Sequence, residues 1–306
     1  MHPLVSVIVP MFNAASTIAR AIESIHAQAY VGQIEIVLID DGSTDRTLEV
    51  IHELGVGDYR VYAQANSGAS AARRKGVDMC QGDIVTFLDA DDMLKPNHIQ
   101  LHVDALSSSP GCKFSFGFCE DIELVHGKYP IVGGLIKDSD KASQIIIDTL
   151  ATLLYDGCFP LSMNIACYKD VALRAMSGRE HVLAANDYDF CLRLALQSDG
   201  VLVPCKTIEI ERFETGITAR NGGLQPAFAC LAAKEAFLLS QRSDETVKAA
   251  LSHRIETSWP AGFVHCLWNG YYKMAVLTLF TGIRFAPTKL AFRNVYWTLH
   301  YILRGN

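Results

Sequence analysis

Hydrophobic residues follow two different periods along the first 120 residues of the chain. Five short runs rich in β-branched and aromatic residues predict buried strands: LVSVIV (4–9), IEIVLI (34–39), RVYA (60–63), DIVTFL (83–88) and KFSFGF (113–118). Residues 16–28 and 44–54 instead place apolar side chains on one helical face, with Ser16 and either Ser43 or Thr44 as helix caps. Strands that alternate with helices are typical of an α/β fold, so we predict a mainly parallel sheet flanked by helices.

The pattern is less regular beyond Gly127. It predicts strands at 161–168, 201–203 and 208–212, and helices at 141–154, 169–176 and 187–197. From residue 225 onward the pattern is helical throughout, with predicted helices at 225–242, 245–257, 261–281 and 288–303. The Gly222-Gly223 pair marks the expected boundary, which divides the chain into a domain at 1–222, with halves at 1–120 and 121–222, and a C-terminal helical extension at 223–306.

Carboxylates stand directly after two of the predicted strands. Asp40 and Asp41 follow the second strand, and Asp89, Asp91 and Asp92 follow the fourth. Ligands of open parallel sheets bind at the carboxyl ends of the strands. We therefore expect both clusters on one rim of the sheet, together with residues 10–13, which follow the first strand.

The second of these clusters contains a D-x-D motif. Its three carboxylates lie within four residues and repel one another unless a cation stands among them. Mg²⁺ and Mn²⁺ prefer such hard oxygen ligands, and they keep coordination positions open for the phosphates of a substrate. A solvated acidic turn is the plainer explanation of a D-x-D that stands alone.

Here the motif does not stand alone. VSVIVPMFN (5–13), EIVLIDDGSTDRT (35–47), ANSGASAARRKGV (65–77) and GDIVTFLDADDML (82–94) occur in this order. Together they resemble the family 2 glycosyltransferases, whose Rossmann-like fold is called GT-A, and the resemblance covers roughly the first 215 residues. It implies an inverting, Mn²⁺- or Mg²⁺-dependent enzyme that moves a sugar from a nucleotide sugar, in the first instance a UDP-sugar, to a hydroxyl of a glycan or lipid-linked acceptor. Residues 1–120 would bind the donor, residues 121–222 would supply the catalytic base and the acceptor site, and the common use would be the synthesis of cell-surface polysaccharides or glycolipids.

The resemblance also implies which residues bind the donor. They are Pro10, Phe12, Asn13, Asp41, Asn66, Gly68, Arg73 and Asp89. Pro10 and Asp41 would flank the nucleobase, Gly68 would allow close approach of the diphosphate, and Arg73 would offer its guanidinium to a phosphate. Arg74 stands where the family usually has Asn, and is either a further donor contact or a surface residue.

The metal and the base are assigned in the same way. Asp91 would ligate the metal directly, while Asp89 would contact the donor's ribose or sugar, or reach the metal through water. Asp92 would cap the turn or helix that follows. In AANDYDFCLRLAL (184–196), Asp187 matches an acid of the family and would deprotonate the acceptor hydroxyl. The alternatives are an N-cap role for Asp187 and Asp189 as the base; the family's preceding acid is Asn186 here.

Several other residues have competing interpretations. In ERFETGITAR (211–220), Glu214 stands where the family often has a His ligand. Possible diphosphate contacts on this loop are Arg212, Thr215, Thr218 and Arg220. His98 and His102 lack a third metal ligand, so we expect exposed helix residues. Met163 and Tyr168 would either face the acceptor or pack in the core.

Composition supports a folded intracellular enzyme. Half of the 306 residues are apolar and 20% are charged, which is enough to bury a substantial core. Nine cysteines without a C-x-x-C pair predict reduced, mostly buried thiols, and the N-terminus lacks the features of a signal peptide, so we expect a cytoplasmic location. The absence of G-x-x-x-x-G-K-[ST] and G-x-G-x-x-G argues against ATPases and dinucleotide-binding enzymes.

Residues 259–306 have a different charge balance. They contain five cations, no Asp or Glu, and many aromatic residues, whereas the whole chain has a net charge of −6. Basic, aromatic, amphipathic helices suit an anionic membrane, so we expect peripheral attachment at the inner face of the membrane. The alternatives are packing on the acidic domain and a homodimer contact; no nucleic-acid partner is expected.

Two other function classes fit the sequence less well. A sugar-phosphate nucleotidyltransferase would have a Gly-rich loop with Arg and Lys after the first strand, and PMFNAAST (10–17) lacks one. A nucleotide-sugar-binding protein without catalysis would not need both Asp91 and Asp187.

Overall fold

The computed structural model describes residues 2–55, 59–118, 145–147, 164–177, 186–211, 225–239, 245–268, 270–285 and 295–296. The strands are β1 (Val5–Met11), β2 (Ile34–Asp40), β3 (Tyr59–Ala63), β4 (Ile84–Phe87), β5 (Met93–Leu94), β6 (Phe114–Phe118), β7 (Ile145–Ile147), β8 (Ile165–Tyr168), β9 (Gly200–Lys206) and β10 (Ile208–Glu209). The helices are α1 (Ile18–His26), α2 (Thr47–Glu53), α3 (Ala69–Met79), α4 (His98–Ser108), α8 (Lys169–Met176), α9 (Asn186–Ala195), α11 (Gln225–Leu239), α12 (Glu245–Trp268) and α13 (Tyr272–Phe285).

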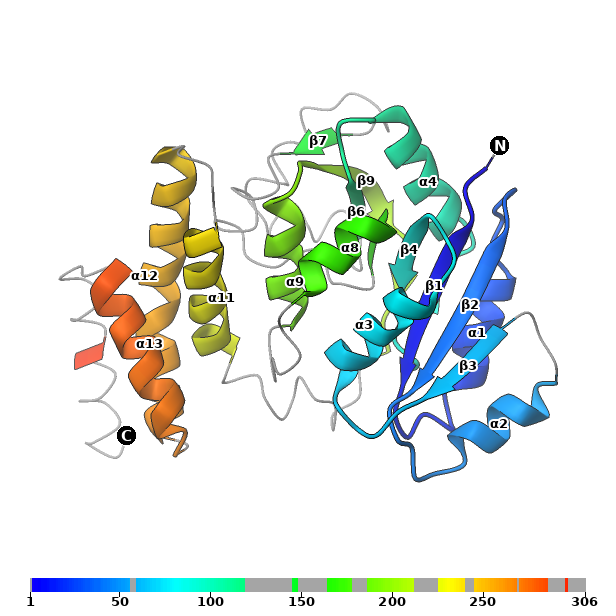
Figure 1. The fold of residues 1–306 in the computed structure, drawn as a ribbon, viewed down its shortest axis with the longest axis horizontal. Helices are drawn as coiled ribbons and strands as arrows, with labels where there is room; N and C mark the ends of the chain where they lie inside the picture. Colours follow the sequence, from blue (N-terminus) through cyan, green and yellow to red (C-terminus); the bar gives the residue numbers. More distant parts are fainter. Residues whose placement is uncertain are drawn as a thin grey trace. The chain divides into compact units, whose positions relative to one another are not determined.

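The described strands form a large sheet in the order β3-β2-β1-β4-β8-β6-β9-β7 (Figure 1). The first four strands are mutually parallel, and β8 joins β4 and β6 in antiparallel pairs. A second, two-stranded sheet pairs β5 with β10. This arrangement confirms the predicted α/β class with a mainly parallel sheet and helices at its faces.

Alternate residues of β1 point to opposite sides of the sheet, as the pleat of a strand requires. Val5, Val7, Val9 and Met11 belong to one apolar core together with buried residues of α1 and α4. Ile8 points the other way, and a Cβ on Gly76 of α3 would lie 2.3 Å from its Cγ2 atom. Gly76 therefore allows α3 to lie directly against the central strand.

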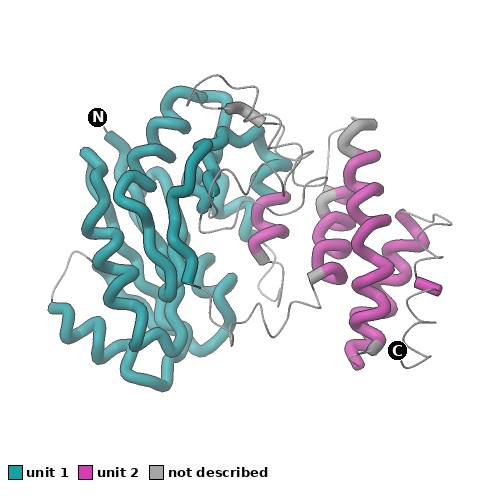
Figure 2. Tube along the Cα trace, turned by 180° about the vertical axis from the view of Figure 1, so that it is seen from behind, with its two compact units in different colours: residues 1–149, 159–183, 193–211 teal, residues 150–158, 184–192, 212–306 magenta. Residues whose placement is uncertain are grey.

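The chain forms two compact units (Figure 2). The first comprises residues 1–149, 159–183 and 193–211, and the second comprises residues 150–158, 184–192 and 212–306. The predicted domain boundary at Gly222-Gly223 lies outside the described residues and stays a prediction. No helix in the described ranges is long and apolar enough to cross a membrane.

Small residues bring the helices of the second unit close together. A Cβ on Gly262 of α12 would lie 2.6 Å from the backbone of Ala227 in α11. A Cβ on Gly282 of α13 would meet the ring of Trp259, which is fully buried. Such contacts allow the backbones to approach more closely than larger side chains would permit.

Two predicted helices were wrong. Within the predicted helix at 141–154, the β-branched run Ile145–Ile147 forms β7, which pairs antiparallel with β9. The predicted break near residue 258 does not exist, because α12 continues through Pro260. The break comes instead at Gly270, whose φ of 78° suits the end of a helix.

The helix caps also differ from the prediction. Neither Ser16 nor Ser43 nor Thr44 caps a helix; the Asp45 carboxylate instead accepts a bond from the Thr47 N–H at the start of α2. The cysteines in the described ranges are free, and all but Cys205 are buried, as predicted for them.

The expectation that His98 and His102 are exposed was wrong. Both are buried on the inner face of α4, with ring centroids 4.5 Å apart. His98 lies in hydrogen-bond distance of the Thr86 hydroxyl and the Thr207 carbonyl, and His102 of the Ser115 hydroxyl. Burial lowers the pKa of His98 to about 4, and burial together with the neighbouring His98 lowers the pKa of His102 well below its usual value. Both rings are therefore neutral structural groups near pH 7.

The burial of His98 predicts a contribution to stability that is lost in acid. The folded-state pKa of His98 lies below the unfolded value, so below about pH 6.5 the unfolded chain binds a proton that the folded chain does not. The contribution of His98 to the free energy of unfolding is therefore complete above about pH 6.5 and is lost as the pH falls toward 4. Between pH 7.5 and 5, urea unfolding should show a decrease of about 2 kcal/mol from this group. His98→Asn should flatten this dependence, and the exposed His26→Asn should leave it unchanged. Equal pH slopes in the wild type and His98→Asn would contradict the assignment.

Candidate active site

The carboxyl ends of three parallel strands meet at one rim of the sheet. Met11 of β1 is in register with Asp40 of β2, and Ile8 of β1 with Phe87 of β4. The Asp41 N–H donates to the Met11 carbonyl at 2.8 Å. The loops that follow β1, β2 and β4 therefore begin side by side, which confirms the predicted common rim.

Asp89, Asp91 and Asp92 form an acidic cluster on this rim. Each offers a carboxylate oxygen, and these atoms all lie within 4.8 Å of one another. Burial, followed by the neighbouring charge of Asp89, raises the pKa of Asp91. Burial raises the pKa of Asp92 to about 7, against a hydrogen bond from Glu211 that lowers it. Three carboxylates this close together are a suitable ligand set for Mg²⁺ or Mn²⁺, and a divalent cation would relieve their mutual repulsion.

Asp92 fixes a distant part of the chain. Its Oδ1 atom accepts a hydrogen bond of 2.9 Å from the N–H of Glu211, 119 residues away. The predicted role as a cap of the following turn or helix was therefore wrong. Glu211 stands beyond β10, which pairs with β5 directly after the cluster, and it forms an ion pair with Arg20 of α1.

The resemblance predicted the loop 211–220 near the donor, but it did not single out Glu211 as a partner of the acidic cluster. The charge of Glu211 contributes to the raised pKa values of Asp91 and Asp92, so it lies within electrostatic reach of both. Glu211 reaches the rim because β10 pairs with β5, and these strands lie far apart in the chain. No local sequence pattern indicates such a pairing.

Arg73 contacts Asp89. Its Nη2 atom lies 2.6 Å from Oδ1 of Asp89, and the arginine is buried in α3. The ion pair holds Asp89 next to α3 and partly neutralises the charge of its carboxylate. The predicted contact between Arg73 and a donor phosphate stays a prediction.

Asp41 holds the loop between β3 and α3. Its Oδ1 atom accepts bonds from the Gln64 side chain and the Ser67 N–H, and its Oδ2 atom accepts from the N–H of Gly68. Gly68 has φ 89°, a conformation that other residues rarely adopt, and directly precedes α3. Asp41 thereby brings Asn66 and Gly68 to the rim; the predicted nucleobase contact of Asp41 is untested.

Asn13 has a similar task in the loop after β1. Its side-chain oxygen accepts bonds from the N–H groups of Thr44 and Asp45, and its φ is 52°. The neighbouring Phe12 is 50% exposed, so it presents an aromatic face at the rim, whereas Pro10 is buried in β1. The predicted donor contacts of Pro10, Phe12 and Asn13 remain predictions.

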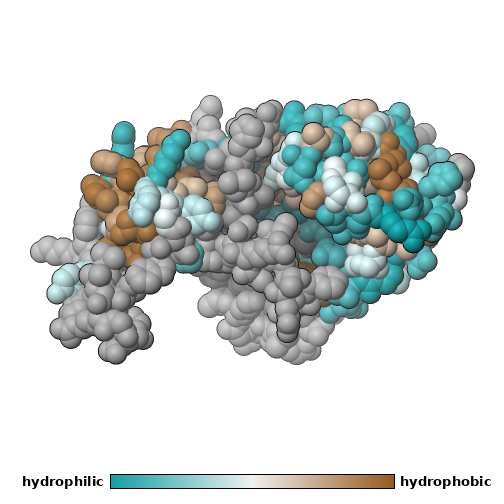
Figure 3. Space-filling model, turned by 90° about the horizontal axis from the view of Figure 1, so that it is seen from below, coloured by the Kyte–Doolittle hydropathy of each residue, from teal (hydrophilic) through white to brown (hydrophobic). Residues whose placement is uncertain are grey.

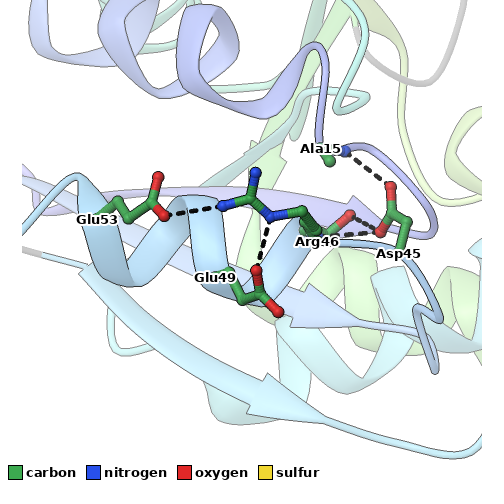
Figure 4. A network of polar contacts seen from close by, with 6 residues as sticks. Ala15, Asp45, Arg46, Glu49 and Glu53 are labelled. Carbon is green, nitrogen blue, oxygen red and sulfur yellow. Dashed lines mark hydrogen bonds and ion pairs between the residues drawn. The ribbon is translucent and has the colours of Figure 1, made fainter.

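A polar network braces the same loops from the side of α2 (Figure 4). The Ala15 N–H donates to the Asp45 carboxylate, whose pKa is lowered because its hydrogen bonds outweigh the opposing effect of burial. Arg46 contacts Glu49 and Glu53 along the helix. The loops that carry Asn13 and Asp45 are thus fixed to each other.

Asp187 and Asp189 lie in the first turn of α9. Asp187 is half-buried and Asp189 buried. The ring between them, Tyr188, lies 5.1 Å from the Arg254 guanidinium of α12. Because this part of α9 belongs to the second unit, the role of Asp187 as the base stays a prediction.

The remaining candidates divide into three groups. Arg74 contacts Asp78 and the Leu173 carbonyl, which favours a structural role. Tyr168 pairs with Ile84, at the opposite end of β4 from Asp89, and packs against the core. The others lie outside the described residues: Met163, Arg212, Glu214, Thr215, Thr218, Arg220 and the side chain of Asn186.

Known proteins are similar to this chain in sequence and in fold. The family model for Glycosyl transferase family 2 matches residues 6–122. An uncharacterized glycosyltransferase of Haemophilus influenzae is 31% identical over 205 residues, which cover 64% of this chain and 74% of the relative. A putative teichuronic acid biosynthesis glycosyltransferase of Bacillus subtilis, TuaG, is 37% identical over 37% of this chain and 46% of its own length.

Solved structures extend the likeness in fold. TarS 1-349 of S. aureus in complex with UDP-GlcNAc has a TM-score of 0.64 at 15% identity, covering 90% of this chain and 82% of that chain. The mannosyltransferase PcManGT of Pyrobaculum calidifontis, in complex with GDP-Man and Mn²⁺, has a TM-score of 0.59 at 17% identity, covering 99% and 86%. The predicted GT-A fold is confirmed.

The acidic cluster predicts stabilisation by metal. Mn²⁺ at a hundred times its dissociation constant should raise the unfolding free energy by about 2.7 kcal/mol, measured as a thermal shift. At the same Mn²⁺ concentration the gain should be smaller at pH 5 than at pH 7.5, since Asp92, with a pKa of about 7, binds a proton in the acidic solution and weakens metal binding. Asp91→Asn should lose most of the shift, and the exposed Asp104→Asn should retain it. An equal shift in Asp91→Asn would refute the metal site.

The contact between Arg73 and Asp89 predicts energetic coupling. A double-mutant cycle of Arg73→Gln and Asp89→Asn, measured by urea unfolding, should give a coupling energy of about 1–3 kcal/mol, because the arginine is buried. The exposed pair Arg174 and Asp170, treated in the same way, should give about 0.5 kcal/mol or less. A coupling energy near zero for the first pair would mean that Arg73 does not hold Asp89.

Proposed function

This chain belongs to Glycosyl transferase family 2, and on that premise we propose that it moves a sugar from a nucleoside-diphosphate sugar to an acceptor hydroxyl with inversion at the anomeric carbon. The observation that carries the proposal is the rim itself. An acidic cluster, a buried arginine and a glycine-bounded loop converge there at the carboxyl ends of β1, β2 and β4. In sheets of this kind the rim is the usual place for a nucleotide.

The donor would bind along the loops that form the rim. Phe12 offers an exposed aromatic face for the nucleobase, and the backbone beside Asn66 and Gly68 can approach the diphosphate closely, since Gly68 has no side chain. A UDP-sugar is our first choice of donor. The solved neighbours bind UDP-GlcNAc in one case and GDP-Man in the other, so a donor panel should contain both nucleotides.

Asp91 and Asp89 would hold the divalent ion. When bound, Mg²⁺ or Mn²⁺ supplies positive charge against the charge that develops on the leaving diphosphate. Arg73 would keep Asp89 in place for this and add positive charge near the same phosphates. Asp92 would maintain the geometry of the turn through its bond to Glu211.

Asp187 would remove the proton from the acceptor hydroxyl as its oxygen attacks the anomeric carbon. Attack from the face opposite the diphosphate would form a glycosidic bond to the acceptor oxygen while the bond between the anomeric carbon and the diphosphate breaks. The nucleoside diphosphate would leave, and the configuration would invert. The support is its place in the first turn of α9 and its match to an acid of the family. Asp189 stands next but one in the same turn and is the competing base.

The acceptor would be a glycan or a lipid-linked intermediate of a cell-surface polysaccharide. The name of the similar Bacillus subtilis protein, a putative teichuronic acid biosynthesis glycosyltransferase, supports this. That relative matches over less than half its length, so the acceptor needs its own test.

The proposed reaction predicts a separation of binding from turnover. With Mn²⁺ and the preferred member of a panel of UDP- and GDP-sugars, Asp187→Asn should lower kcat by about 100-fold or more, because a positioned base contributes about 10²–10⁴-fold. Donor affinity by calorimetry should be unchanged, and NMR of the product should show the inverted anomer. The exposed Asp170→Asn serves as the control. Unchanged turnover in Asp187→Asn, or a loss only in Asp189→Asn, would reject Asp187 as the base.

A further inference from the structure

Large apolar side chains are exposed along one side of α13. Tyr272, Val276, Phe280 and Ile283 are between 43% and 66% exposed. Their spacing of four, four and three residues places them in one row along the helix. Single exposed apolar residues are ordinary, but a continuous row of large ones indicates a contact surface. We call these four residues the α13 row.

The fully buried positions of α13 are occupied by small residues. Ala275, Thr278, Thr281 and Gly282 are buried, and Gly282 lies against the ring of Trp259 in α12. A helix that serves only its own bundle turns its large apolar residues inward. Here the order is reversed, so the α13 row contributes little to the core of its unit. Figure 3 shows hydrophobic side chains gathered over the C-terminal helices, at the left of the view.

Two cations border the α13 row. Lys273 and Arg284 are both exposed and stand eleven residues apart, close to three helical turns, so they lie on one side of the helix next to the row. The sequence from 259 to 306 contains no acid that could neutralise them and adds three more cations. An apolar row with a basic edge matches a surface that is apolar inside and negatively charged outside.

A second copy of the chain fits this surface less well. In a symmetric dimer through α13 the same patch of both copies meets itself. Lys273 and Arg284 of one copy would then approach those of the other copy. Since residues 259–306 contain no acid, the patch offers no partner for these charges.

We propose that α13 binds the surface of an anionic lipid bilayer. The helix would lie parallel to the surface, with the α13 row at the boundary of the acyl chains and Lys273 and Arg284 among the head groups. The inference rests on the second unit alone and requires neither the donor nor the metal. It would place the enzyme where lipid-linked molecules are found.

Sedimentation of the full chain with extruded vesicles tests the proposal. Vesicles of phosphatidylglycerol and phosphatidylcholine in equal parts should bind the protein, vesicles of phosphatidylcholine alone should bind it more weakly, and salt should weaken the binding. The triple variant Val276→Ser, Phe280→Ser, Ile283→Ser should lose at least tenfold in affinity. Lys273→Gln with Arg284→Gln should lose about 30-fold, a factor of about five for each cation.

A matched variant provides the control. Val31→Ser with Leu48→Ser removes two exposed apolar residues of the first unit and should bind vesicles like the wild type. Circular dichroism should show each variant to be folded. Release of nucleotide from a donor in solution should be unchanged in the α13 variants, which separates this test from that of the proposed reaction.

Three results would overturn the proposal. The first is equal sedimentation of the wild type and the triple variant, and the second is the failure of the wild type to bind anionic vesicles. The third is a dimer in sedimentation velocity that the triple variant abolishes, in which case the α13 row would belong to a second copy.

Discussion

The mutual repulsion of three carboxylates is the constraint that organises the rim. Asp89, Asp91 and Asp92 have oxygens within 4.8 Å of one another, and burial raises the pKa values of Asp91 and Asp92. The protein offsets part of this repulsion with the guanidinium of Arg73 and the N–H of Glu211. These two groups come from α3 and from beyond β10, so the cluster depends on elements from distant parts of the sequence. The charge that remains is what a divalent cation would neutralise.

The polar side chains around the cluster mainly accept hydrogen bonds from backbone N–H groups of neighbouring loops. Asp41 accepts from the loop before α3, Asn13 from the loop before α2, and Asp92 from Glu211. Each bond joins two loops that follow different strands. Bonds within the chain therefore hold the rim together, and a binding site that is held in this way loses less binding energy in ordering itself. One residue can both hold a loop and contact the donor. The hydrogen bonds of Asp41 and Asn13 to their loops are therefore compatible with their predicted donor contacts.

The correct predictions from the sequence are ones that depend on local period and on strand ends. The strands of the first four βα repeats, the helix at Lys169–Met176 and the common rim were correct because each follows from a pattern within about ten residues or from the rule for parallel sheets. His98 and His102 were wrong because their burial depends on Thr86, Ser115 and Thr207, which come from other elements. The partner of Asp92 was missed for the same reason, with 119 residues between the two groups.

The second unit shows why average hydropathy does not reveal which face of a helix is buried. Gly262 lies against Ala227 and Gly282 against the ring of Trp259, and contacts this close leave no room for Phe280 or Tyr272 on that side of α13. The large residues must then lie outside, where water surrounds them at a cost of about 25 cal/mol for each Å² of apolar surface. A bundle that needed only its own stability would gain by reversing this order. The exposed row of α13 is thus better explained by a partner outside the unit than by the demands of its own packing.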